Sequence, residues 1–153
     1  MTKLHDRLNS NLADWNLTYV KLHHYHWYVK GPHFLALHVK FEELYDFAAL
    51  SLDEVAERLL AIGGKPASTM KEYLKLTTLS EAGNETNDID MVKAIVDDFI
   101  KLVNELSQTR ELAEESGDAP TADLLVKQIE ELQKQTWMLS ATAGIDVPTK
   151  VKV

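Results

Sequence analysis

The chain has 153 residues, of which 45% are hydrophobic. This length and composition suffice for one domain with a complete core, and we expect that domain to cover residues 1–153. A formal net charge of -8 argues against a permanent nucleic-acid-binding surface, and the lack of cysteine excludes disulfides and thiolate metal sites. The first residues contain no apolar signal region and no apolar run has membrane-spanning length, so we expect a soluble, cytoplasmic protein.

The first predicted helix covers residues 4 to 29. Its inward-facing residues recur at steps of three and four, and they are Leu8, Leu12, Trp15, Tyr19, Leu22 and His26. Gly31 and Pro32 end this helix, because proline restricts the residue before it and glycine permits unusual dihedral angles. The resulting turn can fold His26 back toward His38 on the next helix.

The second predicted helix covers residues 34 to 62 and stops at Gly63 and Gly64. One of its faces is apolar and is expected to contact the core, with Leu37, Phe41, Leu44, Ala48, Val55, Leu59 and Ile62. Another face carries His38, Glu42, Asp53 and Glu57, and Ala49, Leu52, Ala56 and Leu60 lie among these polar residues. Such apolar groups indicate that this second face is buried against another surface.

Two imidazoles and three carboxylates lie within 32 consecutive residues, at His26, His38, Glu42, Asp53 and Glu57. A mixed nitrogen and oxygen set without thiolate favours iron or manganese as the bound metal. Taken singly, a histidine on an apolar stripe is usually a hydrogen-bonded core residue, and carboxylates four residues apart usually face solvent. Together they predict a metal site, because buried charges are costly unless they are paired or bound to metal.

The spacing also predicts where this site lies. His38 and Asp53 are 15 residues apart, which is roughly 22 Å along a helix that rises about 1.5 Å per residue. One metal ion cannot bridge that distance within one chain. An antiparallel two-fold pairing of two such helices would bring His38 and Glu42 of one copy to Asp53 and Glu57 of the other. Asp46 lies near the same face and is either a substitute ligand or an ordinary surface carboxylate.

Thr69 and Glu72 have the spacing of a capping box for a short helix at residues 68 to 75, inside a connection of about 25 residues. A third long helix is predicted from residue 88 or 90 to just before Gly117, and a fourth from residues 118 to 121 up to about residue 143. The long connection can cross from one end of a bundle to the other. We therefore predict an all-α, ferritin-like four-helix bundle with a long crossover carrying a short helix.

Lys150 and Lys152 in the tail could touch phosphate, although two lysines supply little counterion release.

Three stretches of the chain resemble one family closely. They read His26-Trp27-Tyr28-Val29-Lys30-Gly31-Pro32-His33-Phe34, then Leu37-His38-x-x-Phe41-Glu42-x-x-Tyr45 with Asp53-Glu54-Val55-Ala56-Glu57-Arg58. They are similar to the Dps family of bacterial mini-ferritins, and the similarity continues through residues 62 to 74 and, more weakly, to Trp137.

This resemblance implies a hollow homo-dodecamer of tetrahedral symmetry that oxidises Fe(II), preferentially with hydrogen peroxide, and stores the ferric mineral inside. It implies iron ligands at two-fold interfaces, with His26 and His38 from one subunit and Asp53 and Glu57 from its neighbour. The position of Glu42 is usually aspartate in the family, so its extra methylene could change occupancy of the second iron position.

The resemblance also assigns further roles. Carboxylates that line three-fold pores for iron entry match Glu114, Asp118 and Asp123, although acidic residues near a helix start are also favoured by the helix dipole. Trp27 matches an aromatic that quenches stray oxidising equivalents, with burial in the core or an interface as its main structural role. Some family members bind DNA through lysine-rich extensions, and the short N-terminus here lacks one, so we do not expect DNA binding. Two alternatives are a non-catalytic DNA-compacting protein and a structural zinc or manganese oligomer.

Overall fold

The computed structural model describes residues 2–148 of the chain, so Lys150 and Lys152 lie outside the described residues. It contains α1 (Lys3–Tyr28), α2 (Phe34–Ala61), α3 (Met70–Leu76), α4 (Asp88–Glu115) and α5 (Ala119–Thr142). Within residues 2–148 every regular element is a helix, and no helix is long and apolar enough to cross a membrane. The all-α prediction and the helix positions are confirmed, with bounds that differ from those predicted by one or two residues.

A capping side chain marks the start of four helices, α1, α3, α4 and α5, whereas α2 begins after the turn at His33 without a side-chain cap. Thr2, Thr69, Asn87 and Asp118 accept hydrogen bonds from backbone N–H groups in the first turns of α1, α3, α4 and α5. At Thr69 the N-cap half of the predicted capping box is present, because Glu72 N donates to the Thr69 hydroxyl at 3.2 Å. The Glu72 carboxylate accepts from that same hydroxyl at 2.7 Å, which links the two side chains directly.

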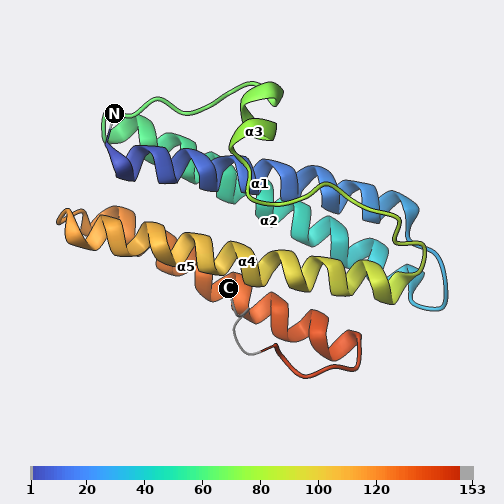
Figure 1. Cartoon of the computed structure of the whole chain (residues 1–153). Helices are drawn as coiled ribbons and strands as arrows, with labels where there is room; N and C mark the ends of the chain where they lie inside the picture. The colour runs from blue at the N-terminus through green and yellow to red at the C-terminus, as the bar shows by residue number, and fades with distance from the viewer. Residues whose placement is uncertain (1, 149–153) are drawn as a thin grey trace.

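The helices form two antiparallel pairs joined by the crossover. Short turns connect α1 to α2 and α4 to α5, whereas residues 62–87 run along the bundle and carry α3 on its outside (Figure 1). Because the crossover connects opposite ends of the bundle, α2 and α4 run parallel, which is the ferritin-like arrangement.

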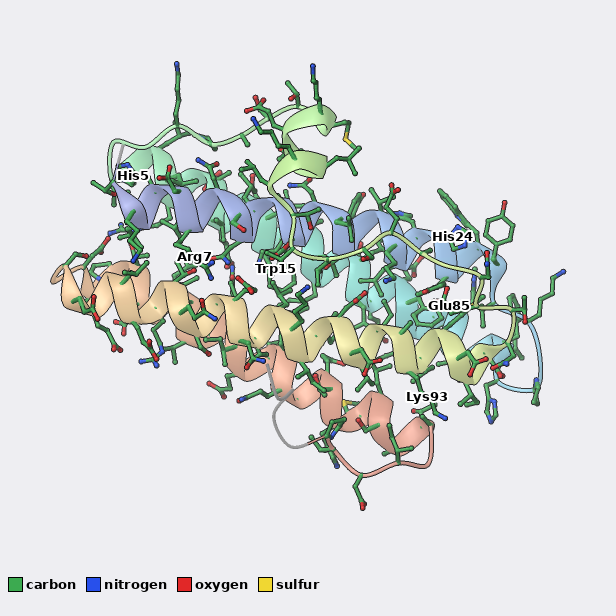
Figure 2. The ribbon with its side chains drawn as sticks, viewed as in Figure 1. His5, Arg7, Trp15, His24, Glu85 and Lys93 are labelled. Atoms are coloured by element: carbon green, nitrogen blue, oxygen red, sulfur yellow. The ribbon has the colours of Figure 1, made fainter. Side chains whose placement is uncertain are left out.

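The core lies between the two pairs. Trp15 is fully buried on α1 and reaches toward the α4–α5 pair, where its Nε1 donates to Gln128 Oε1 at 3.1 Å (Figure 2). Gln128 in turn donates to the Ser51 carbonyl on α2 at 3.2 Å. This buried chain of hydrogen bonds fixes α1, α2 and α5 relative to one another, because a buried amide left unpaired would cost about 1–3 kcal/mol.

Polar residues of α1 hold the crossover in place. The Asn9 side chain donates to the carbonyl oxygen of Lys65 at 3.0 Å and accepts from the N–H of Ala67 at 2.8 Å, so it holds the start of the crossover. Asp14 accepts from Thr77 and from the N–H and hydroxyl of Thr78 at 2.6 to 2.8 Å. Burial raises the pKa of the Asp14 carboxyl, and these hydrogen bonds counter that rise. The crossover therefore lies against α1 and leaves part of α2 exposed.

Candidate metal centre

The turn between α1 and α2 brings two predicted ligands, His26 and His38, face to face. Their rings stack with centroids 3.8 Å apart and an interplanar angle of 11°. Gly31 makes this turn possible, since its φ of 115° is a conformation that other residues rarely adopt. The predicted folding of His26 back toward His38 is therefore confirmed.

Each of the two histidines is fixed by the backbone of the other. His26 Nδ1 lies 2.6 Å from the carbonyl oxygen of His38, and His38 Nδ1 lies 2.7 Å from that of His26. Because a carbonyl oxygen only accepts, each Nδ1 must carry the proton and donate it. In the neutral ring this leaves the Nε2 lone pair free, which is the arrangement of a metal-binding histidine held by a carbonyl partner.

The turn itself is clamped to the start of α4. Asp88 is buried there and accepts from His33 Nδ1 at 2.8 Å and from His33 N at 3.3 Å. The hydrogen bond from the His33 side chain is the main reason that the pKa of the Asp88 carboxyl lies below its ordinary value. A methyl group at Gly31 would come within 3.2 Å of this carboxylate, so the close approach also requires glycine.

Aromatic side chains surround the histidine pair. The ring of Phe34 stacks on that of His38 with centroids 5.1 Å apart, and the ring of Tyr45 meets His26 edge-on at 5.4 Å. His26 is buried, with 8% of its surface exposed, and His38 is half-buried. Packing on both sides restricts the rings to one orientation, as a preorganised ligand pair requires.

Glu42 lies one helical turn after His38 and its side chain is exposed. Its Oε1 accepts a hydrogen bond from the Tyr45 hydroxyl at 3.3 Å, so one carboxylate oxygen has a partner within the chain. Sequence reasoning assigned no role to Tyr45, although its position three residues after Glu42 on one helix was the signal that could have indicated the contact. Asp46 is exposed one turn after Glu42, and the contacts of the described residues give it no ligand role.

Asp53 and Glu57 lie further along the exposed face of α2, away from the histidine pair. Glu42 and Asp53 are 11 residues apart, about 16 Å along the helix. Within residues 2–148 neither Asp53 nor Glu57 makes a side-chain hydrogen bond or ion pair, and no three His, Asp or Glu side chains gather into one metal-binding group. A single chain therefore brings together His26 and His38, with Glu42 nearby, and leaves the other two carboxylates apart.

The same face of α2 exposes large apolar side chains. Leu35 is 80% exposed near the start of the helix, and Leu60 is 62% exposed near its end. Both belong to the face that carries the predicted ligands, and they lie beyond the ligands at either end. An exposed apolar surface rimmed by charged residues is typical of a protein–protein contact.

Trp27 is 68% exposed and points away from the core of the chain. Its ring lies 5.3 Å from that of His23. Of the two burial roles considered for Trp27, the chain's own core is excluded, because the residue falls on the outer side of α1, next to the turn. Its burial in an interface stays a prediction.

The three carboxylates predicted at the iron-entry pore lie around the junction of α4 and α5, but they differ in their bonding. Asp118 caps α5 through Thr121 and pairs with Arg58 Nη2 at 2.9 Å, and Glu114 pairs with Arg110 at 2.7 Å. Asp123 is exposed. Asp118 therefore acts as the N-cap of α5, the helix-terminal role considered for it. The same carboxylate is the one that would line the predicted pore.

The bonding of Asp118 predicts a pH-dependent contribution to stability. Burial alone would raise the pKa of this carboxyl, but hydrogen bonds from Thr121 and the guanidinium of Arg58 outweigh burial and hold the pKa below its ordinary value of 3.8. The stabilisation is therefore present above pH 3.8 and is lost as the pH falls through the lower pKa of the folded state. Asp118→Asn should lower the free energy of unfolding by about 1 kcal/mol at neutral pH, and the difference should shrink in acid. Urea denaturation at one protein concentration measures this, with Asp123→Asn as the matched control that should change nothing.

Comparison with known proteins agrees with the fold. The family model of the ferritin-like domain matches residues 5–145. The chain is 50% identical over 134 residues to DNA protection during starvation protein 2 of Bacillus anthracis, and this match covers 88% of the chain and 92% of the relative. The chain belongs to the Dps family.

Solved Dps structures have the same fold. Dps from Listeria innocua, in crystals soaked with zinc, has a TM-score of 0.91 and 37% identity, and the match covers 94% of this chain and 98% of that one. Dps from Vibrio cholerae O1, described as a member of a broad superfamily of ferritin-like diiron-carboxylate proteins, has a TM-score of 0.88 and 36% identity over 92% and 88% of the two chains. The predicted ferritin-like fold is confirmed, and membership of the family supports an iron-binding mini-ferritin with ferroxidase-type chemistry.

Proposed function

We propose that this Dps chain is an iron-sequestering mini-ferritin that oxidises Fe(II), preferentially with hydrogen peroxide, at sites shared between two subunits. The ferric product would be stored as mineral inside a hollow dodecamer of tetrahedral symmetry in the cytoplasm. One observation carries the proposal: His26 and His38 are held so that Nε2 of each neutral ring is free, while Asp53 and Glu57 lie on the exposed face of α2 and have no ion-pair partner within residues 2–148.

The proposed interface is an antiparallel pairing of two α2 helices. A register that places His38 opposite Glu57 of a second copy also places Glu42 opposite Asp53, because both pairs are centred on the same point of the helix. The same register sets Leu35 opposite Leu60, so the two most exposed apolar residues of this face would cover each other. One pairing thus accounts for both the ligands and the apolar groups.

The donor set suits Fe(II) as a substrate. His26 and His38 supply imidazole nitrogen, and Asp53, Glu57 and Glu42 supply carboxylate oxygen, which together fit iron better than softer metals, with zinc or manganese as possible occupants. We assign Asp53 and Glu57 as the strongest ligands, Glu57 as a bridge between two ions, and the histidines as ligands of the second ion.

The proposed reaction balances with two iron ions per peroxide. Each Fe(II) gives up one electron and becomes Fe(III), the O–O bond breaks, and the two oxygen atoms take up two protons from solvent to leave as two waters. Because the two electrons arrive together, no hydroxyl radical is released. Iron would reach these sites through pores lined by Glu114, Asp118 and Asp123. Arg110 and Arg58 compensate the first two carboxylates, so the exposed Asp123 would supply most of the negative charge that raises the local Fe(II) concentration.

Anaerobic Fe(II)-loaded protein mixed with hydrogen peroxide tests the proposal. Asp53→Ala should slow the loss of Fe(II) at least about 10-fold, the effect typical of losing even an outer partner of a metal ligand. Asp97→Ala removes an exposed aspartate from α4 and is the matched control that should keep wild-type kinetics.

Unchanged kinetics in Asp53→Ala would leave only a structural metal-binding oligomer. The DNA-compacting alternative predicts gel retention that weakens steeply with salt, which the net charge of -8 disfavours. Light scattering that finds about twelve chains per particle would support the shell.

A further inference from the structure

The start of α4 holds the turn between the two histidine-bearing helices. Both lie at the same end of the bundle (Figure 1), and Asp88, the first residue of α4, joins them. Its Oδ2 accepts from the ring Nδ1 of His33 at 2.8 Å and from the His33 N–H at 3.3 Å, while its Oδ1 accepts from the N–H of Ile89 at 2.8 Å. One carboxylate therefore ties the α1–α2 turn to a helix of the other pair.

The capping of α4 does not require this carboxylate. Asn87 already caps the helix by accepting from the N–H of Asp90, and the side chain of Asp90 is exposed in the same first turn. A carboxylate that served only the helix dipole could be exposed in the same way. Asp88 instead is 6% exposed, and burying a charge is costly unless it has partners. Its side-chain partner outside α4 is His33, so the turn accounts for the burial.

α2 is the helix that needs such support. It begins after His33 without a side-chain cap, whereas each of the other four helices has one from a residue at its own start. The carbonyl of His33 accepts from the N–H of Leu37 at 2.9 Å, and His38 follows directly. Holding His33 on α4 therefore sets where α2 starts and how His38 faces His26.

We propose that Asp88 is a positioning residue for the metal site, which through His33 and the turn holds His26 and His38 where both can bind iron. This inference rests on the proposed function. The two rings exchange hydrogen bonds with each other's carbonyl groups at 2.6 and 2.7 Å, so a small shift of the turn would weaken both bonds at once. A set of metal ligands has to stay within about 0.5 Å of its productive geometry. Asp88 acts through the turn and is not itself a ligand.

The test titrates cobalt(II) into the assembled, metal-free protein without air and follows the visible absorption of the bound ion. His38→Ala identifies the signal that belongs to the histidine pair, because it removes one of the two imidazoles. Asp88→Ala should raise the Kd of that signal about 10-fold, as loss of a group that orients a metal ligand does. Asp88→Asn should recover most of the affinity, because its amide oxygen can accept from both N–H groups of His33.

Turnover gives a second measurement that separates positioning from folding. With peroxide as oxidant, Asp88→Ala should raise the KM for Fe(II) about 10-fold and leave kcat at saturating Fe(II) near wild type, because the ligands are intact but less well held. Asp90→Ala is the matched control, since it removes an exposed carboxylate from the same turn of α4, and it should keep both wild-type values. His33→Ala removes the ring donor and keeps the carboxylate, so it should also weaken cobalt(II) binding.

Wild-type cobalt(II) affinity in Asp88→Ala, or in His33→Ala where Asp88→Ala does not assemble, would overturn the assignment and leave Asp88 with a structural role alone. An equal loss of affinity in Asp90→Ala would overturn it too, because the effect would then be one of charge at the helix start. Failure of wild type to oxidise Fe(II) with peroxide would overturn the proposed function itself, and the cobalt(II) titration would still decide the role of Asp88.

Discussion

Two inactive variants, His38→Ala and Asp53→Ala, should recover about a quarter of wild-type ferroxidase turnover when they are assembled together at equal amounts. In the proposed interface each site takes its histidines from one subunit and Asp53 and Glu57 from the other. A mixed pair then has one site with both defects and one site with none. Random mixing makes half of the pairs mixed, and half of their sites are intact. Turnover per chain is measured after dissociation and reassembly, with differently tagged chains to prove mixing.

The matched control is the mixture of His26→Ala with His38→Ala. Both changes damage the histidine half of a site, so every site in a mixed pair keeps one defect and no turnover should return. Recovery in the first mixture alone would show that the two halves come from different chains. Equal behaviour of the two mixtures, in assemblies shown to contain both variants, would contradict the shared site.

The helices were predictable because their ends depend on local chemistry. Thr69 caps α3 through the N–H of Glu72, as their spacing predicts, and Gly63, Gly117 and Gly144 end helices with positive φ angles that favour glycine. The apolar periodicity of α1 and α2 likewise identified the core face, since Leu8, Trp15, Phe41 and Val55 are all fully buried. These features are set by residues within a turn or two of one another.

Contacts between distant segments were not predictable in this way. The sequence placed His26 near His38, but the exchange of hydrogen bonds with each other's carbonyl groups depends on the path of the turn and on its clamp at Asp88. The fixing of the crossover by Asn9 and Asp14 was also missed, because polar residues on a helix face solvent unless the fold brings partners to them. The pairing with Asp53 and Glu57 stays a prediction, since it is a property of two chains.

Leu60→Glu should break the assembly and abolish ferroxidase turnover without unfolding the chain. Leu60 is 62% exposed in the single chain, so the substitution disturbs little of the core. In the proposed register it lies opposite Leu35 of a second copy, where each buried leucine contributes about 1.5–3 kcal/mol and an unpaired carboxylate would be costly to bury. Because the interface is two-fold symmetric, it contains two Leu60–Leu35 contacts, and the substitution removes both. This doubles the loss of association free energy. Size-exclusion chromatography with light scattering should find small species, and circular dichroism should show unchanged helix content.

Leu60→Met is the matched control, because it keeps an apolar side chain of similar volume at the same position, and it should keep assembly and turnover. The combination separates the roles of fold and interface. If Leu60→Glu chains stay folded, stay small and still oxidise Fe(II) with peroxide, the site lies within one chain and the pairing of α2 helices is wrong. If they stay folded and lose turnover while all five predicted ligands are intact, then the missing component is the second subunit, since the substitution removes no donor atom from His26, His38, Glu42, Asp53 or Glu57.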